Sequence, residues 1–233
     1  MKRTITTITI AAVALATAIG LGAPAFADTG VDAAKTALTN RINLRLTALQ
    51  RDTTIIGAAK NLTAGHKSTL DTLMSQDTAG LSALKTKVAG ETTLAALKTD
   101  ATSMVDDYRI FLLVGPKVRL TTAGDAESAA VTRLRTLHDK LADLVAKAKA
   151  GGADTSAAEA QLADMSAAVD KVGTDTSGQV DGLLAVAPGP DAAAIQAKVS
   201  AVHAALASGR SDLATAISDA KKVRDFLKGL KTK

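Results

Sequence analysis

The residues best placed to do chemistry stand together at positions 106–109, directly before five apolar residues in a row and the pair Gly115-Pro116. Neighbouring carboxylates can bind a cation or act in acid–base chemistry. The structural alternative is that one carboxylate pairs with a nearby cation while the rings of Tyr108 and Phe111 fill a wide spot in the core. We favour the structural role and keep four residues as a candidate binding site: Asp106, Asp107, Tyr108 and Arg109.

The three histidines give weaker evidence of a functional site. His66, His138 and His203 each stand alone, without a second ligand at the spacing of a motif such as HExxH. The chain also has no nucleophile elbow and no glycine-rich phosphate loop. We therefore expect histidines at the surface or at the edge of the core, and we predict no catalytic residue, no metal site and no cofactor.

Charge is uneven along the chain. Residues 154–219 hold nine acidic side chains against three basic ones, which is typical of a solvated helix face. The last thirteen residues reverse this balance with six cations against Asp225: Lys221, Lys222, Arg224, Lys228, Lys231 and Lys233. Cations near a helix C-terminus complement the helix dipole, which accounts for part of the cluster. The others, with Lys228, Lys231 and Lys233 as candidates, could contact an anionic polymer of the cell envelope.

Residues 1–27 have the form of an export signal. Lys2 and Arg3 precede an apolar run that is too short to span a membrane, and the run ends before Ala-Phe-Ala at 25–27. We expect cleavage after Ala27, a secreted or extracytoplasmic location, and one helical domain over 28–233.

Composition narrows the class of the mature chain. Without Lys2 and Arg3, the 26 remaining basic residues exceed the 23 acidic ones by three, which is too little to indicate nucleic-acid binding. Cysteine is absent, which rules out disulfides, thiol catalysis and a lipid-modified cysteine. No second long apolar segment follows the signal, so we expect no transmembrane anchor in the mature chain.

The apolar pattern after residue 28 is helical almost throughout, in a chain rich in alanine, the best helix former. The first helix is expected to end near residue 61, and its buried stripe is Leu38, Ile42, Leu46, Leu49, Thr53 and Ile56. A second helix should end at Gly90, and Thr92 or Thr93 should cap a third. The fourth carries Val131, Leu134, Leu137, Leu141 and Leu144 and ends at Gly151-Gly152.

The closing segments predict two further helices, one over about 156–183 and one that opens at Asp191. They would form an antiparallel hairpin around Pro188-Gly189-Pro190. Pro116 disfavours a helical Gly115, so a kink or a short extended stretch is expected there. The predicted fold is all-α, an elongated antiparallel, coiled-coil-like bundle with one kinked segment near 108–116.

The segment at 106–118, Asp-Asp-Tyr-Arg-Ile-Phe-Leu-Leu-Val-Gly-Pro-Lys-Val, resembles a segment of small exported helical proteins of high-GC Gram-positive bacteria. Those proteins carry an Asp-Tyr-Arg-Val-Tyr-like stretch that runs into a proline. The resemblance implies an exported helical protein and transfers no catalytic residue.

From these observations we expect an exported, non-enzymatic helical protein that acts in the envelope or outside the cell as an interaction or structural protein. Its partner would be an anionic envelope polymer or another protein. The alternative is a bundle that binds a small ligand or a metal in a pocket near residues 106–116.

Overall fold

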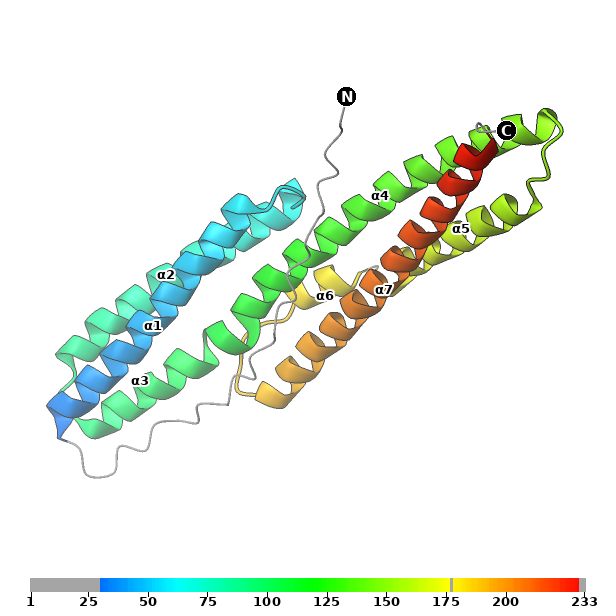
Figure 1. The fold of residues 1–233 in the computed structure, drawn as a ribbon. Helices are drawn as coiled ribbons and strands as arrows, with labels where there is room; N and C mark the ends of the chain where they lie inside the picture. The colour runs from blue at the N-terminus through cyan, green and yellow to red at the C-terminus, as the bar shows by residue number, and fades with distance from the viewer. Residues whose placement is uncertain (1–29, 177, 231–233) are drawn as a thin grey trace.

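The computed structural model describes residues 30–176 and 178–230, so the expected signal peptide lies outside the described residues. Every element in this part of the chain is helical, and the elements form an elongated bundle (Figure 1), as the all-α prediction requires. They are α1 (Val31–Ala58), α2 (Ala64–Gly90), α3 (Leu94–Asp106), the π-helical turn η1 (Ile110–Val114), α4 (Gly115–Ala150), α5 (Ser156–Thr176), α6 (Gln179–Leu184) and α7 (Ala192–Leu230). No described helix is long and apolar enough to cross a membrane.

Helix α4 connects the two ends of the molecule. Its 36 residues span about 54 Å at about 1.5 Å per residue. Helix α1 packs against its start, α2 and α3 pack against α1 in the apolar cluster that includes Val118 of α4, and α5 and α7 pack along its second half (Figure 1). A smaller apolar cluster joins η1 and the start of α4 to α6 and to the first half of α7. At one end of the molecule the bundle therefore consists of α4, α5 and α7. At the other end it consists of α1, α2 and α3 with the start of α4.

Local signals set most helix boundaries where the sequence predicts them. The hydroxyl of Thr63 accepts from the backbone N–H of His66 at the start of α2, and the hydroxyl of Thr93 caps α3 in the same way. Asp191 accepts from the backbone N–H of Ala194 at the start of α7. These caps satisfy N–H groups that have no partner within the first helical turn.

The kinked segment is present, but the break lies earlier than Gly115. Gly115 is helical, with φ −59° and ψ −46°, and Pro116 occupies the first turn of α4, where a missing N–H costs nothing. The expectation of a non-helical Gly115 was wrong. The chain instead turns at Arg109, which has φ 45°, and continues through η1 directly into α4.

The helix expected over 156–183 is two helices. Helix α5 ends at Thr176 and α6 begins at Gln179, after Gly178 in the left-handed region with φ 68°. Only glycine adopts this conformation without a steric penalty. The apolar stripe continues across the break because Val180 and Leu183 are both buried.

Three expectations about the core were wrong. The Phe111 ring is 42% exposed instead of filling the core, whereas Ile110 and Leu113 on either side of it are buried. Leu137 and Leu144 of α4 are 40% and 47% exposed. In α1, Thr53 is exposed and Leu46 only half-buried against the core, whereas the neighbouring positions Asp52 and Arg45 are buried although they are charged.

Candidate functional site

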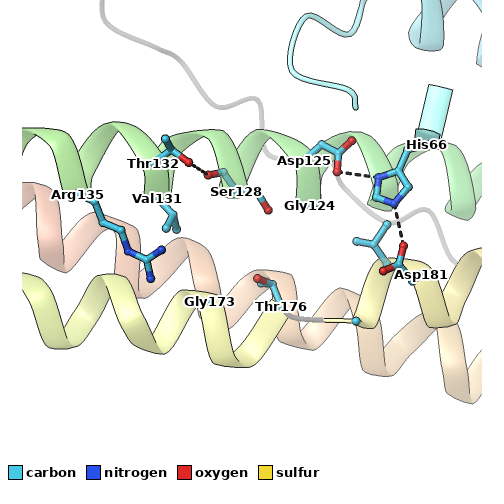
Figure 2. A pocket seen from close by; sticks show the side chains of 12 residues that line it. His66, Gly124, Asp125, Ser128, Val131, Thr132, Arg135, Gly173, Thr176 and Asp181 are labelled. Atoms are coloured by element: carbon cyan, nitrogen blue, oxygen red, sulfur yellow. Dashed lines mark hydrogen bonds and ion pairs between the residues drawn. The ribbon is translucent and has the colours of Figure 1, made fainter. Parts of the chain in front are cut away.

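A cleft of about 370 Å³ opens at the middle of the molecule, where the start of α2, the middle of α4, the end of α5 and α6 meet (Figure 2). Its lining is mostly polar and includes three glycines that leave room for it. The lining residues are His66, Gly124, Asp125, Ser128, Val131, Thr132, Arg135, Gly173, Thr176, Gly178, Val180 and Asp181.

His66 lies between two carboxylates at one end of this cleft. Its Nδ1 is 2.8 Å from Oδ1 of Asp125 on α4, and its Nε2 is 2.9 Å from Oδ1 of Asp181 on α6 (Figure 2). The second oxygen of Asp125 accepts from the backbone N–H of Thr63 at 2.7 Å. The start of α2 is therefore tied to α4 and, through the ring, to α6.

The two carboxylates set the charge of this ring. Burial acts to lower the pKa of His66, but the hydrogen bonds and charges of Asp181 and Asp125 outweigh it and raise that pKa above its usual value. The imidazolium suits the site because both of its N–H groups can donate to a carboxylate. Because both ring nitrogens are hydrogen-bonded, His66 links α2 to α4 and to α6. We call His66 with Asp125 and Asp181 the His66 clasp.

The arrangement does not form a metal site. No group of histidine and carboxylate side chains in the described residues could hold a metal ion. At the far side of the cleft Arg135 pairs with Asp170 of α5 at 3.0 Å. The hydroxyls of Thr132 and Thr176 bond carbonyls of their own helices. The cleft can therefore offer hydrogen bonds to a small polar molecule, chiefly from Arg135 and Ser128.

Two of the four residues singled out at 106–109 secure the Pro-Gly-Pro turn. Arg109 donates from Nη2 to Oδ1 of Asp106 at 2.7 Å and to the carbonyl of Pro190 at 2.9 Å. Its Nε donates to the carbonyl of Gly189 at 2.7 Å. These bonds hold the left-handed backbone of Arg109 and connect α3 to the loop before α7. The expected pairing of Asp106 with a cation is confirmed.

The other two residues face elsewhere. Asp107 is exposed, and Tyr108 is half-buried against α2, where its ring lies over Gly80. Burial first, and then the charges of Asp107 and Asp77, raise the pKa of Tyr108. None of the residues 106–109 lines the cleft.

The basic C-terminus is partly neutralised within its own helix. Lys222 pairs with Asp219 at 2.8 Å and Arg224 with Asp225 at 2.9 Å. Lys228 is exposed and lies 4.0 Å from Asp225. Lys231 and Lys233 lie outside the described residues.

Sequence reasoning placed His66 correctly at the edge of the core but missed its partners. Asp125 and Asp181 are 59 and 115 residues away, so no local spacing indicates the clasp. It also missed the ion pair of the buried Glu127 with the half-buried Arg210, at 3.0 Å between α4 and α7. The one available signal was an acidic residue among apolar ones. Asp77, an acidic residue that stands at the helical spacing of Leu73 and Leu81 in α2, is buried and faces Lys117.

Comparisons with known proteins identify no relative of this chain. No protein-family model matches the chain, and neither a curated protein nor a solved structure matches it.

Proposed function

We propose that this protein is an exported, non-enzymatic interaction protein that binds anionic polymers of the cell envelope. The observation that supports the proposal is a strip of exposed basic and apolar side chains along the seam between α4 and α7. We call it the basic strip, and it consists of Leu137, Lys140 and Leu144 on α4 with Ile217, Lys221 and Lys228 on α7.

The ion pairs between helices place the two halves of the strip side by side. Arg135 pairs with α5, so Leu137 and Leu144 lie on the opposite flank of α4, toward α7. On α7, Arg210 reaches Glu127 of α4, and Ile217 follows Arg210 by seven residues on the same flank. Both flanks therefore border one seam.

The two helices also run toward the same end of the molecule (Figure 1). Because Glu127 and Arg210 are 83 residues apart in the chain, positions with this offset lie at about the same height. Leu137 is thus level with Lys221, and Leu144 is level with Lys228. The strip intersperses apolar and basic side chains over about three helical turns of α7.

The strip combines exposed apolar side chains with lysines whose charge is not neutralised by a close ion pair. Leu137, Leu144 and Ile217 are 40%, 47% and 43% exposed. Lys140 and Lys221 make no ion pair within the described residues, and the 4.0 Å contact of Lys228 with Asp225 is weak. Clustered exposed cations attract a polyanion, and salt screens that attraction.

The proposal is tested with the mature protein, residues 28–233, and isolated cell wall in a sedimentation assay. We expect binding at low salt and release by about 0.5 M NaCl, where the Debye length is roughly 4 Å. The triple variant Lys140→Glu, Lys221→Glu, Lys228→Glu should stay in the supernatant. The matched control, Lys60→Glu, Lys85→Glu, Lys98→Glu, changes the net charge equally at exposed positions elsewhere.

Equal loss of binding in both triple variants would mean that net charge alone drives association. Binding of the strip variant at the level of the parent would contradict the proposal. A third variant, Lys231→Glu with Lys233→Glu, separates the contribution of the chain end from that of the strip.

A second candidate function is the binding of a small polar ligand, which the cleft beside His66 favours. The cleft lies at the middle of the molecule instead of near residues 106–116. The variant Gly173→Leu tests this function, because a Cβ at Gly173 would approach only the Arg135 guanidinium, at 3.9 Å. A ligand that stabilises the parent protein in a thermal-shift panel, but not this variant, would support the cleft as a binding site.

A further inference from the structure

Buried charges in the described part of the chain come with an opposite charge nearby, and Arg45 is the exception. The other seven are paired or face a charge of opposite sign. These are Asp52 with Arg119, Asp77 with Lys117, Asp100 with Lys87, Asp125 with His66, Glu127 with Arg210, and Asp219 with Lys222.

Arg45 is 6% exposed and lies on the core stripe of α1, between Ile42 and Leu49. Its Nη1 donates to the carbonyl of Arg41 at 3.1 Å, and its guanidinium carbon lies 5.2 Å from the centre of the Phe111 ring. No carboxylate of the described residues lies within ion-pair distance, and the nearest charge acting on it is the like charge of Arg41. Burial first, and then Arg41, lower the pKa of Arg45.

A guanidinium in this position is costly to keep. Removing a charge from water carries a large penalty that an opposite charge normally offsets. The stacking of Arg45 on Phe111 compensates for only part of it. An anion beside the guanidinium would offset the rest of this penalty.

The surroundings leave room for that anion. Nε and Nη2 of Arg45 donate no hydrogen bond within the described residues, yet neither is a fully buried atom, so both reach solvent. Phe111 is 42% exposed beside them. Farther along the seam between α1 and α4, Arg119 lies against Gly115 and is 41% exposed, with a long 3.9 Å contact to Asp52.

We propose that this arginine seam, defined as Arg41, Arg45 and Arg119 with Phe111, attracts an oxyanion, either a carboxylate or a phosphate, which binds at Arg45 beside Phe111, while Arg119 adds positive charge farther along the seam. Arg45 is the principal contact because its two free donor nitrogens match the paired oxygens of such a group. The exposed part of the Phe111 ring contacts the apolar body of the ligand. This site lies on α1, η1 and α4 and is independent of the basic strip.

The test measures thermal unfolding of the mature protein in sodium phosphate or sodium D-glucuronate, with NaCl at matched ionic strength as the reference. A bound anion stabilises the folded state in proportion to its concentration over its Kd, so Tm should rise above the NaCl value. A response to phosphate alone identifies a phosphate ligand, and a response to glucuronate alone identifies a carboxylate ligand.

Arg45→Met removes the charge and keeps the length of the side chain. We expect the Kd for the anion to rise about tenfold or more, since hydrogen bonds to a charged group are lost. Without anion, this variant should melt at a higher temperature than the parent, because an unpaired buried charge is gone. Arg51→Met on the exposed face of α1 is the matched control and should respond to the anion as the parent does.

An equal anion response in Arg45→Met and the parent would overturn the proposal, as would a parent that responds to neither anion beyond NaCl. If Arg45→Met does not fold, Arg119→Met and Arg45→Lys replace it. The first removes a cation at an exposed position, and the second keeps the charge without the planar fork. Both should weaken the response, and an unchanged response in both would overturn the proposal.

Discussion

We expect Glu127 to lower the stability of the folded protein as the pH rises, which is the reverse of ordinary acid unfolding. The side chain is 5% exposed between α4 and α7. Its Oε1 accepts from Nε of Arg210 at 3.0 Å, whereas its Oε2 is buried without a hydrogen-bond partner. Burial raises the pKa of Glu127 to about 7, although the charge and the hydrogen bond of Arg210 act to lower it.

The size of the effect follows from proton linkage. Between the usual pKa of 4.5 and the folded value of about 7, the unfolded chain loses its proton while the folded protein keeps it. Rising pH therefore favours unfolding, by about 2.5 kcal/mol between pH 5 and pH 8 at 1.36 kcal/mol per pKa unit. Glu127→Gln lacks this contribution. From pH 5 to pH 8 its free energy of unfolding should therefore decrease less than that of the parent protein, by about 2.5 kcal/mol.

The assay is urea unfolding followed by far-UV circular dichroism at pH 5, 6, 7 and 8, with the free energy of unfolding extrapolated to zero denaturant. The exposed change Asp164→Asn on α5 serves as the control and should keep the slope of the parent. Parallel pH profiles for the parent and Glu127→Gln would refute the reasoning. They would mean that water or a rearrangement solvates the carboxylate in the folded protein.

Three further predictions concern the clasp, the π-turn and the packing of Tyr108. His66→Gln should destabilise by about 1–3 kcal/mol, as the loss of hydrogen bonds to charged groups does. The loss should be larger at pH 6 than at pH 9 in urea melts, because the raised pKa makes the imidazolium contribution disappear as the pH rises. Phe111→Ala should cost about 1–2 kcal/mol, whereas Leu113→Ala should cost about 2–5 kcal/mol because its side chain is fully buried; similar midpoints would contradict this ranking. Gly80→Ala would place a methyl group 2.5 Å from Oη of Tyr108, so the fluorescence of the only tyrosine should change, and an unchanged spectrum would contradict the packing.

Helix boundaries were predictable because their causes are local. Thr63, Thr93 and Asp191 supply the caps within three residues of the N–H groups they satisfy. The left-handed backbone at Arg109 was not predictable, since the bonds that hold it go to Gly189 and Pro190, about 80 residues away. The helix expected over 156–183 breaks at Gly178 because this glycine has a positive φ, and a glycine in the sequence does not by itself indicate that conformation.

The errors in the core have a common geometric origin. Steps of three and four residues fit two neighbouring helical faces almost equally well, so Arg45 and Leu46 could exchange roles. The structure buries the arginine. Five consecutive residues go all the way around a helical turn, so the five apolar residues of η1 cannot all face inward. Phe111 is the exposed one and Leu112 is half-buried. The partners of His66 and Arg45 depend on the packing of separate helices, and no sequence spacing indicates them.

Fractionation of the cells that make the protein tests the central proposal most directly. Intact mass and location are measured for the native protein in cytosol, membrane, wall and medium. The account predicts a form that begins at Asp28, recovered with the wall and released by about 0.5 M NaCl. Full-length protein with Met1 retained in the cytosol, or mature protein that stays in the wall at this salt concentration, would contradict it.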